Sequence, residues 1–568
     1  MTKIKLLSSA LMLSLLAACA TQDTGKTIAG GNSSADITIF SINDFHGNLQ
    51  ADKPVPYMAA IDHHGHDHAG APMTTPAGGY VYLASMLKQR RAAVKDSIFV
   101  GAGDLMGASP IGSAMLRDEP VIEALNQLGL SVTALGNHEF DAGGVALQAK
   151  LKGECPVSGC AFPGFSGAKY DYIAANVLNK SDAQPWIKPY VIRQVGEFKV
   201  AFIGAVTSDT PNLVAGDGVK GLRFEEEASA INRYVPEIQK QGVAAIVLLI
   251  HEGAFYKGAA NDPTYVCDGL QGPIIEISKK LDKAISLVVS GHSHQGYTCK
   301  IDGRLVVQAR SYGAYLTETT LSIDRSSQQV IKAVATNHLI EQAKLVADPV
   351  AQKLVTQMTT LTTAVRSRII ATLPAPLMRN SKPGLFDSSL GNVIADAQLK
   401  FAQAGAGADI AFMNAGGIRG DLTGEQQAQS FVINYGDIYA VQPFGNNLIR
   451  MRLNGEQIVA LLQQQWGAGE NPKKLFVSQG FSYRWSRSAA AGQRVQDVRL
   501  NGVPLEKQRD YTVIVNSFLA DGGDGFTVLK QGRDRHLIGR DLDAFEAHIR
   551  DQGQSLSKLK TDRVQSIE

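Results

Sequence analysis

Gly136-Asn137-His138-Glu139-Phe140-Asp141 follows the apolar run 131–135, which predicts a polar turn at the end of a buried strand. Four more polar segments follow apolar runs in the first half of the chain: Asn43-Asp44-Phe45-His46-Gly47, Gly103-Asp104, His251-Glu252 and Gly291-His292-Ser293-His294. Because ligands of open α/β sheets gather beyond the carboxyl ends of the strands, we expect these side chains to converge. Oxygen ligands mixed with imidazoles indicate a two-metal hydrolytic site.

Apolar runs and helical patterns alternate along the first half. Strands are expected at 37–42, 97–100, 131–135, 243–250, 285–289, 305–309 and 317–323, a hairpin at 191–203, and helices at 80–91 and 120–128. This rhythm predicts two sheets covered by helices. Residues 48–79 are expected to be a loop-like insertion, and its tract His63–His68 is either solvated or a weak metal binder.

The second half begins after a long amphipathic segment. Asp348 and Pro349 are suited to the N-cap and first turn of a helix. Apolar residues then recur at helical spacing as far as Val365, which predicts a helix joining two domains. Beyond it, a helix from Leu390 and strands at 408–413, 447–453 and 511–516 indicate a second α/β domain.

Length and charge limit the class of protein. A chain of 568 residues suggests at least two domains. The formal net charge is +2, and loss of a leader that contains Lys3 and Lys5 would leave a neutral chain. A neutral chain gives no electrostatic case for binding a nucleic acid polymer. No heptad pattern indicates an oligomer, so we expect a monomer.

The N-terminus is expected to be a targeting segment. Lys3 and Lys5 precede the apolar run 6–16, which is too short to span a bilayer. Small residues before Cys19 resemble a bacterial lipoprotein cleavage box, with residues 1–18 as the signal and 19–35 as a tether. This predicts export and a lipid anchor on Cys19 in the Gram-negative outer membrane. The alternative is an ordinary secretory signal and a soluble periplasmic protein.

Four further cysteines are Cys155, Cys160, Cys267 and Cys299. An even number in an exported chain indicates disulfides, and three pairings are possible. We favour pairing Cys155 with Cys160, and Cys267 with Cys299. Free thiols remain the alternative.

The ordered polar segments resemble those of the calcineurin-like metallophosphoesterases. Together with Asn414-Ala415-Gly416-Gly417-Ile418-Arg419 in the second half, they resemble the 5′-nucleotidase family, which includes bacterial periplasmic UDP-sugar hydrolase/5′-nucleotidases. The resemblance implies a four-layer αββα metallophosphoesterase domain (36–340), a linker helix (341–365) and a second α/β, substrate-binding domain (366–568).

The same resemblance assigns roles in the first half. It implies that the first metal is held by Asp44, His46, Asp104 and His294, and the second by Asp104, Asn137, His251 and His292. His138 would stabilise the phosphoryl transition state, and Asp141 would orient His138. The ligand types allow Zn²⁺, Mn²⁺, Co²⁺ or Mg²⁺.

The second half would select the substrate. Phe444 and Phe518 would clamp a base, and Asp524 would bind the ribose. The remaining implied contacts come from Asn414, Gly416, Gly417 and Arg419. The family's further arginine falls at Gly384, so Arg379 or Lys382 would replace it. Because the metals and the clamp lie in different domains, we expect the domains to close for catalysis.

These features predict a two-metal 5′-nucleotidase acting on extracellular or periplasmic nucleotides. The alternatives are a UDP-sugar or dinucleotide pyrophosphatase, or a 2′,3′-cyclic nucleotide phosphodiesterase, since these activities share the same motifs. A more remote alternative is a non-catalytic nucleotide-binding lipoprotein.

Overall fold

The computed structural model describes residues 33–50, 54–57, 73–214, 216–380, 386–405, 407–466, 473–558 and 561–567. The expected leader with Cys19, the tract His63–His68, and Lys382 and Gly384 all lie outside these ranges. Within the described residues, no helix has the length and apolar character needed to cross a membrane.

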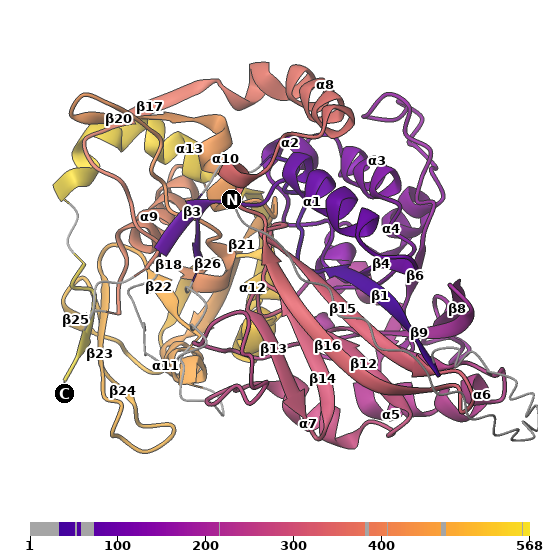
Figure 1. The fold of residues 1–568 in the computed structure, drawn as a ribbon. Helices are drawn as coiled ribbons and strands as arrows, with labels where there is room; N and C mark the ends of the chain where they lie inside the picture. The colour runs from indigo at the N-terminus through magenta and orange to yellow at the C-terminus, as the bar shows by residue number, and fades with distance from the viewer. Residues whose placement is uncertain are drawn as a thin grey trace, which may run out of the picture.

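Two six-stranded sheets form the centre of the first half (Figure 1). The first has the order β16 (Gln329–Leu339), β15 (Tyr315–Asp324), β1 (Ser34–Ile42), β4 (Ser97–Ala102), β5 (Val132–Ala134) and β6 (Asp171–Ile173). The second has the order β13 (Gly296–Ile301), β14 (Arg304–Ala309), β12 (Ile285–Val289), β11 (Ala245–His251), β9 (Phe198–Val206) and β8 (Tyr190–Val195). Strands β1, β4, β5 and β6 run parallel, as do β9, β11, β12 and β14.

Alternating side chains bury both faces of each sheet. In β1, Ile37 and Ile39 belong to the core between the two sheets, whereas Phe40 and Ile42 face the helices. The helices on that side are α1 (Tyr80–Ala92), α2 (Ile111–Ala114), α3 (Glu119–Leu128) and α4 (Gly144–Leu151). The second sheet is covered by α5 (Glu227–Asn232), α6 (Val235–Gln239) and α7 (Pro273–Lys280). The result is the expected four-layer arrangement of helices, two sheets and helices.

Residues 48–79 contain more regular structure than the sequence predicted. Strands β2 (Pro54–Tyr57) and β3 (Met73–Pro76) pair antiparallel, so describing the whole segment as loop-like was wrong. Two prolines in the four residues of β2 hide the strand pattern, because proline is usually depleted from strands. A second small pair joins β7 (Val177–Asn179) to β10 (Leu222–Phe224).

The second half is built around a five-stranded sheet with helices on both faces. Its order is β22 (Leu475–Val477), β18 (Ile410–Asn414), β26 (Asp510–Asn516), β21 (Asn447–Asn454) and β27 (Arg533–Arg540). A three-stranded sheet has the order β17 (Ile369–Leu373), β20 (Ser430–Asn434) and β19 (Glu425–Gln427). A four-stranded sheet has the order β25 (Val503–Pro504), β24 (Val495–Leu500), β23 (Phe481–Trp485) and β28 (Val564–Ser566). The helices are α9 (Ser389–Gln403), α10 (Tyr435–Val441), α11 (Gly455–Gln463), α12 (Ser517–Ala520) and α13 (Asp541–Gln552).

Helix α8 (Pro349–Arg366) leads from one half to the other. Asp348 caps it by accepting hydrogen bonds from the N–H groups of Val350 and Ala351, each at 3.0 Å. Its apolar face, including Leu354 and Met358, joins the core of the first half. Figure 1 shows α8 at the top of the view beside α2, with the chain continuing into β17. The expected linker helix therefore packs onto the first half through its apolar face, and it also contacts α10 of the second half.

Two disulfides join Cys155 to Cys160 and Cys267 to Cys299, which is the pairing favoured from the sequence.

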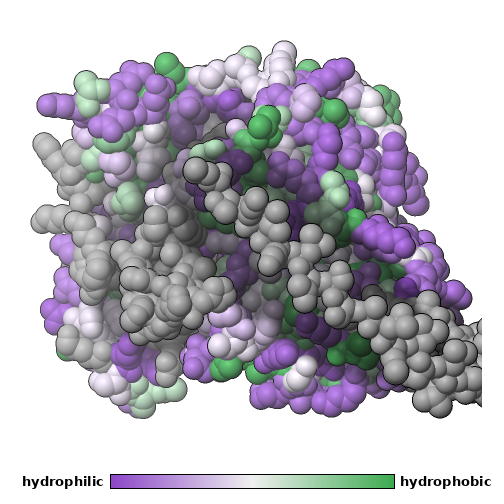
Figure 2. Space-filling model, in the orientation of Figure 1, coloured by the Kyte–Doolittle hydropathy of each residue, from purple (hydrophilic) through white to green (hydrophobic). Residues whose placement is uncertain are grey.

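The face of the molecule in Figure 2 is mostly hydrophilic, with hydrophobic residues interspersed.

The packing of α8 can be tested with two substitutions on one helix. Met358 is 2% exposed and lies against α2, where a Cβ on Gly112 would be 3.3 Å from the Met358 methyl carbon. Met358→Ala should lower the free energy of unfolding by about 2–5 kcal/mol, because it removes buried apolar atoms and leaves a cavity. Leu361→Ala, at a position 47% exposed, should change it by less than about 0.5 kcal/mol. Urea denaturation measures both, and equal effects would contradict this packing.

Candidate metal centre

The predicted ligands lie at the carboxyl ends of strands from both sheets. Asp44 and His46 follow β1, Asp104 follows β4, Asn137 follows β5, His251 ends β11, and His292 and His294 follow β12. Six of these seven residues form two clusters, Asp44, His46 and His294, and Asp104, His251 and His292, in each of which the ligand atoms lie within 4.8 Å of one another. The two sheet edges therefore meet at one polar centre.

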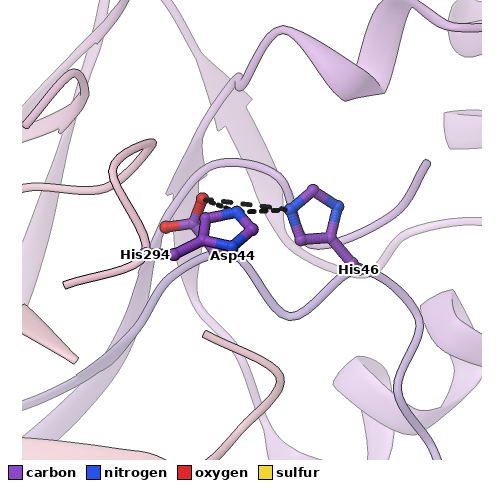
Figure 3. Close-up of side chains that lie close together, drawn as sticks. All are labelled: Asp44, His46 and His294. Atoms are coloured by element: carbon purple, nitrogen blue, oxygen red, sulfur yellow. Dashed lines mark hydrogen bonds and ion pairs between the residues drawn. The ribbon is translucent and has the colours of Figure 1, made fainter. Parts of the chain in front are cut away.

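The first cluster places two imidazoles beside a carboxylate (Figure 3). His46 Nε2 lies 3.2 Å from His294 Nε2, which lies 3.2 Å from Asp44 Oδ1. His46 Nδ1 donates to the Gly107 carbonyl at 2.9 Å, so in a neutral ring Nε2 carries the free lone pair. Such a hydrogen bond, made by the ring nitrogen that faces away from the ion, fixes the tautomer of a metal-binding histidine.

The second cluster is arranged in the same way. His251 Nδ1 donates to the Ala102 carbonyl at 2.8 Å, which leaves Nε2 unprotonated in the neutral ring. Asp104 Oδ2 lies 2.9 Å from His251 Nε2 and 3.6 Å from His46 Nε2. The Asp104 carboxylate therefore stands between the two clusters, where a shared ligand would be needed.

Two buried atoms of the centre fit a cation. Among the described residues, Asn137 Oδ1 has no hydrogen-bond partner, and the unprotonated His251 Nε2 faces only another acceptor, Asp104 Oδ2, at 2.9 Å. Asn137 is 2% exposed and His251 is 0% exposed, so neither atom is compensated by bulk water. An unpaired buried acceptor costs about 1–3 kcal/mol. An amide oxygen and an imidazole lone pair are both ligands for divalent metals, so the residues present fit such an ion.

The backbone of the centre is strained. Asp44, His46, Asp104, His292 and His294 all have positive φ, between 46° and 72°. Residues other than glycine rarely adopt this left-handed conformation, and such strain gathers at functional sites. Five of the seven predicted ligands are therefore held in place against their own backbone preference.

The Glu139 carboxylate ties two of the ligand loops together. It accepts backbone N–H hydrogen bonds from Asp104 at 2.9 Å, Leu105 at 2.8 Å and Gly136 at 2.7 Å. Burial and the nearby Asp104 charge raise the pKa of Glu139 to about 7. Glu139 lies within the motif 136–141, but the sequence pattern alone assigns it no role. Its position holds the loop of Asp104 against the turn that carries Asn137.

His138 belongs to neither metal cluster. Its Nδ1 lies 3.0 Å from Asp141 Oδ1, which leaves Nε2 as the second ring nitrogen able to reach a ligand. Burial acts to lower the pKa of His138, but the Asp141 and Asp104 carboxylates outweigh it and the net shift is upward. The ring also stacks on Phe444 of the second half, with centroids 5.7 Å apart and planes inclined by 17°.

One cavity of about 190 Å³ is lined by residues of both halves. Its lining includes, from the first half, Asp104, Asn137, His138, Asp141, Leu213, Val214, His292 and His294, and, from the second, Asn414, Gly416, Gly417, Arg419, Phe444, Asn446, Asn516, Phe518 and Asp524. The predicted metal centre and the predicted substrate clamp therefore face the same space.

The predicted clamp residues differ in what they contact. The Arg419 guanidinium carbon lies 5.7 Å from the Phe444 ring centroid. The Phe518 ring packs on Gly523, where an added Cβ would be 2.5 Å from it. Arg379 is not part of the cavity lining and instead donates to the Arg419 carbonyl at 3.0 Å. Arg379 therefore supports the Arg419 loop in this structure.

Comparison with known proteins assigns the chain to a protein family. Residues 37–296 match the calcineurin-like phosphoesterase model, and residues 369–531 match the 5′-nucleotidase C-terminal domain model. A cell wall protein of Listeria monocytogenes is 32% identical, over 93% of this chain and 69% of its own length. The chain belongs to the 5′-nucleotidase family.

Other members and structures resemble the chain along most of its length. An endonuclease, YhcR, of Bacillus subtilis is 29% identical over 94% of this chain, which spans only 41% of that protein. A snake venom 5′-nucleotidase of Naja atra is 26% identical, over 90% of this chain and 94% of its own. The crystal structure of a 5′-nucleotidase precursor from Thermus thermophilus has a TM-score of 0.73 and 25% identity, covering 94% of this chain and 100% of that chain.

Several residues that line the cavity were not predicted from the sequence. Leu213 and Val214 are apolar residues just after the short helix Thr210–Asn212, and nothing in their pattern separates them from core residues. Asn446 lies two residues after the predicted clamp residue Phe444, and Asn516 ends β26, but the sequence pattern assigns neither a role.

Glu139→Gln tests whether this carboxylate holds the ligand loops. Glutamine presents one acceptor and one donor group, so backbone N–H groups that now face Oε1 or Oε2 would face another donor. We expect divalent-metal affinity to fall about 10–100-fold, as with other changes behind metal ligands. Isothermal titration with Mn²⁺ measures this. Glu123→Gln is the matched control, because Glu123 also accepts a backbone N–H, from Ser166 at 2.9 Å, away from the centre. Unchanged affinity in Glu139→Gln would contradict the role.

Proposed function

We propose that this protein is a metal-dependent 5′-nucleotidase that hydrolyses nucleotides to a nucleoside and phosphate. The observation that carries the proposal is the single cavity shared by the two His/Asp clusters and the second half's aromatic and cationic residues. A phosphate group needs the first set, and a base with its sugar needs the second. Membership of a phosphoesterase family supports the same reaction class.

In this proposal two divalent cations occupy the centre. One is held by Asp44, His46, Asp104 and His294, and the other by Asp104, Asn137, His251 and His292. The unpaired Asn137 Oδ1 supports these assignments, as do the Nε2 atoms of His46 and His251, which face the Asp104 carboxylate while each Nδ1 bonds to a backbone carbonyl. When bound, two such cations supply a nucleophilic water at neutral pH and offset the charge on the phosphate oxygens.

His138 is proposed as the catalytic residue that acts on the leaving oxygen. Asp141 holds Nδ1, so Nε2 can donate a proton or a hydrogen bond to that oxygen as the ester bond breaks. The Asp141 carboxylate beside Nδ1 favours the protonated ring needed for this step. Phe444 stacks on the same ring from the second half.

Residues of the second half are proposed to choose the substrate. Arg419 is suited to an anionic oxygen pair because its guanidinium is planar and permanently charged. Phe444 and Phe518 offer ring faces for a base, and stacking contributes about 1–3 kcal/mol per base. Leu213 and Val214 add an apolar wall from the first half.

A substrate panel tests the proposal. Phosphate release from AMP should exceed cleavage of UDP-glucose and of 2′,3′-cyclic AMP, and EDTA should abolish it because the nucleophile depends on the cations. Added Mn²⁺, Zn²⁺, Co²⁺ or Mg²⁺ should restore it to different extents. Activity that survives chelation would contradict the metal mechanism, and faster cleavage of UDP-glucose would favour a pyrophosphatase instead.

His138→Ala separates catalysis from metal binding. We expect kcat for AMP to fall about 10²–10⁴-fold, the range typical of a lost general acid. Metal content, measured by mass spectrometry, should stay at the wild-type value because neither metal cluster includes His138. His338→Ala is the control, because it also removes an imidazole paired with a carboxylate but lies outside the cavity lining. His338 Nε2 is 3.0 Å from Glu318 Oε2. Loss of metal from His138→Ala would contradict the assigned role.

A further inference from the structure

Three polar side chains at the wall of the cavity form a directed series of hydrogen bonds. Asn516 Nδ2 donates to Asn414 Oδ1 at 3.0 Å, and Asn414 Nδ2 donates to Asp524 Oδ2 at 2.7 Å. Asn516 is 0% exposed and Asn414 is 2% exposed, so water does not compete for these bonds. We call this series the amide relay.

The direction of the amide relay is set by a helix cap. Asn516 is the N-cap of α12, and its Oδ1 accepts a hydrogen bond from the Leu519 N–H at 2.8 Å. An asparagine side chain has an acceptor at one end and a donor at the other. Because the cap fixes the oxygen of Asn516, its nitrogen must face Asn414. The oxygen of Asn414 is then occupied, so its nitrogen must face Asp524.

Asn516 has no polar atom left for a ligand, although it borders the cavity. Its oxygen caps α12, and its nitrogen lies 3.0 Å from Asn414 Oδ1 and 3.7 Å from the Met413 sulfur. Its place in the cavity wall is therefore a supporting one.

Asp524 is the end of the relay that faces the ligand. Its φ is 57°, in the left-handed region, so its backbone does not hold it in a preferred conformation. An added Cβ on Gly416 would be 3.2 Å from Asp524 Oδ2, which leaves little space on that side. Oδ2 is bound by Asn414, whereas Oδ1 accepts no hydrogen bond from any described residue. The free oxygen is available to a hydroxyl pair of a ligand.

We propose that Asn516 is a positioning residue for nucleotide recognition, and that through Asn414 it orients the Asp524 carboxylate toward the sugar hydroxyls. This inference rests on the proposed nucleotide substrate. It assigns sugar recognition to the N-cap of α12 as well as to the residue that touches the ligand.

Asn516→Asp tests the relay with almost no change in shape. Aspartate is a good N-cap, so it should keep the bond from the Leu519 N–H and the fold. Its second oxygen cannot donate to Asn414, so the Asn414 amide should turn over and present its own oxygen to Asp524. Two acceptors would then face each other. Losing a hydrogen bond to a charged group predicts a KM for AMP raised roughly 10- to 100-fold, with a smaller change in kcat.

A second substitution should reverse the effect. In Asn516→Asp, adding Asp524→Asn restores a complementary series that runs in the opposite direction and leaves an amide oxygen for the sugar. Asp524→Asn should therefore raise KM in the wild-type background and lower it in the Asn516→Asp background. The KM increase in Asn516→Asp should also be much smaller for 2′,3′-dideoxy-AMP, which lacks the hydroxyls that Asp524 would bind.

Asn454→Asp is the matched control. Asn454 caps α11 through the Gln457 N–H at 2.8 Å and is absent from the cavity lining, so its KM should equal that of wild type. If Asn516→Asp does not fold by circular dichroism, Asn516→Ser keeps a capping oxygen, removes the amide donor, and should also raise KM for AMP.

The outcomes separate the relay from the proposed function. An unchanged KM in Asn516→Asp or Asn516→Ser, or an Asp524→Asn effect of the same sign in both backgrounds, would overturn the relay. A wild-type protein that releases phosphate from p-nitrophenyl phosphate but neither cleaves AMP nor binds adenosine by calorimetry would overturn the proposed nucleotide function.

Discussion

The Glu139 carboxylate holds together the loops on which the metal centre depends. Its oxygens accept N–H groups from the Asp104 loop and from Gly136, so the ends of β4 and β5 stay in fixed register. Without it, those loops would leave buried N–H groups unpaired, at about 1–3 kcal/mol each. The same loops also direct the His138 N–H to Asp104 Oδ1 at 2.8 Å. One buried side chain thereby relates the positions of Asp104, Asn137 and His138.

The strained ligand backbone explains why so rigid a scaffold surrounds this centre. Each residue held in a sparsely populated conformation costs of order 1–3 kcal/mol and persists only where its surroundings impose it. Both sheets are buried on both faces, and the core between them provides that constraint. His251 differs from the other imidazoles because it is the last residue of β11, and its ring bonds to Ala102 of the neighbouring sheet. The two sheets are thus joined directly at the metal centre.

The sequence predicted the layers and the convergence of the polar turns, because alternating apolar residues and strand-end polar residues are local patterns. It could not predict the positive φ of residues such as Asp44, since backbone strain is imposed by tertiary packing. Leu213 was missed because an apolar loop residue looks the same whether it faces a core or a cavity. The stacking of Phe444 on His138 depends on how the halves meet, which no local pattern records.

The contact between the two halves also gives the predicted clamp residue Phe444 neighbours within the protein itself. Phe444 was expected to stack on the base, and here its ring stacks on His138 and its centroid lies 5.7 Å from the Arg419 guanidinium carbon. A nucleotide entering the cavity must share this space, so substrate binding and access to His138 are physically linked. Helix α8 is anchored in the first half's core, and Arg366 at its end donates to Gln50 of that half at 2.6 Å. The same helix also packs against α10 of the second half, and α10 leads directly to Phe444, so α8 relates the core of the first half to the position of that ring over His138.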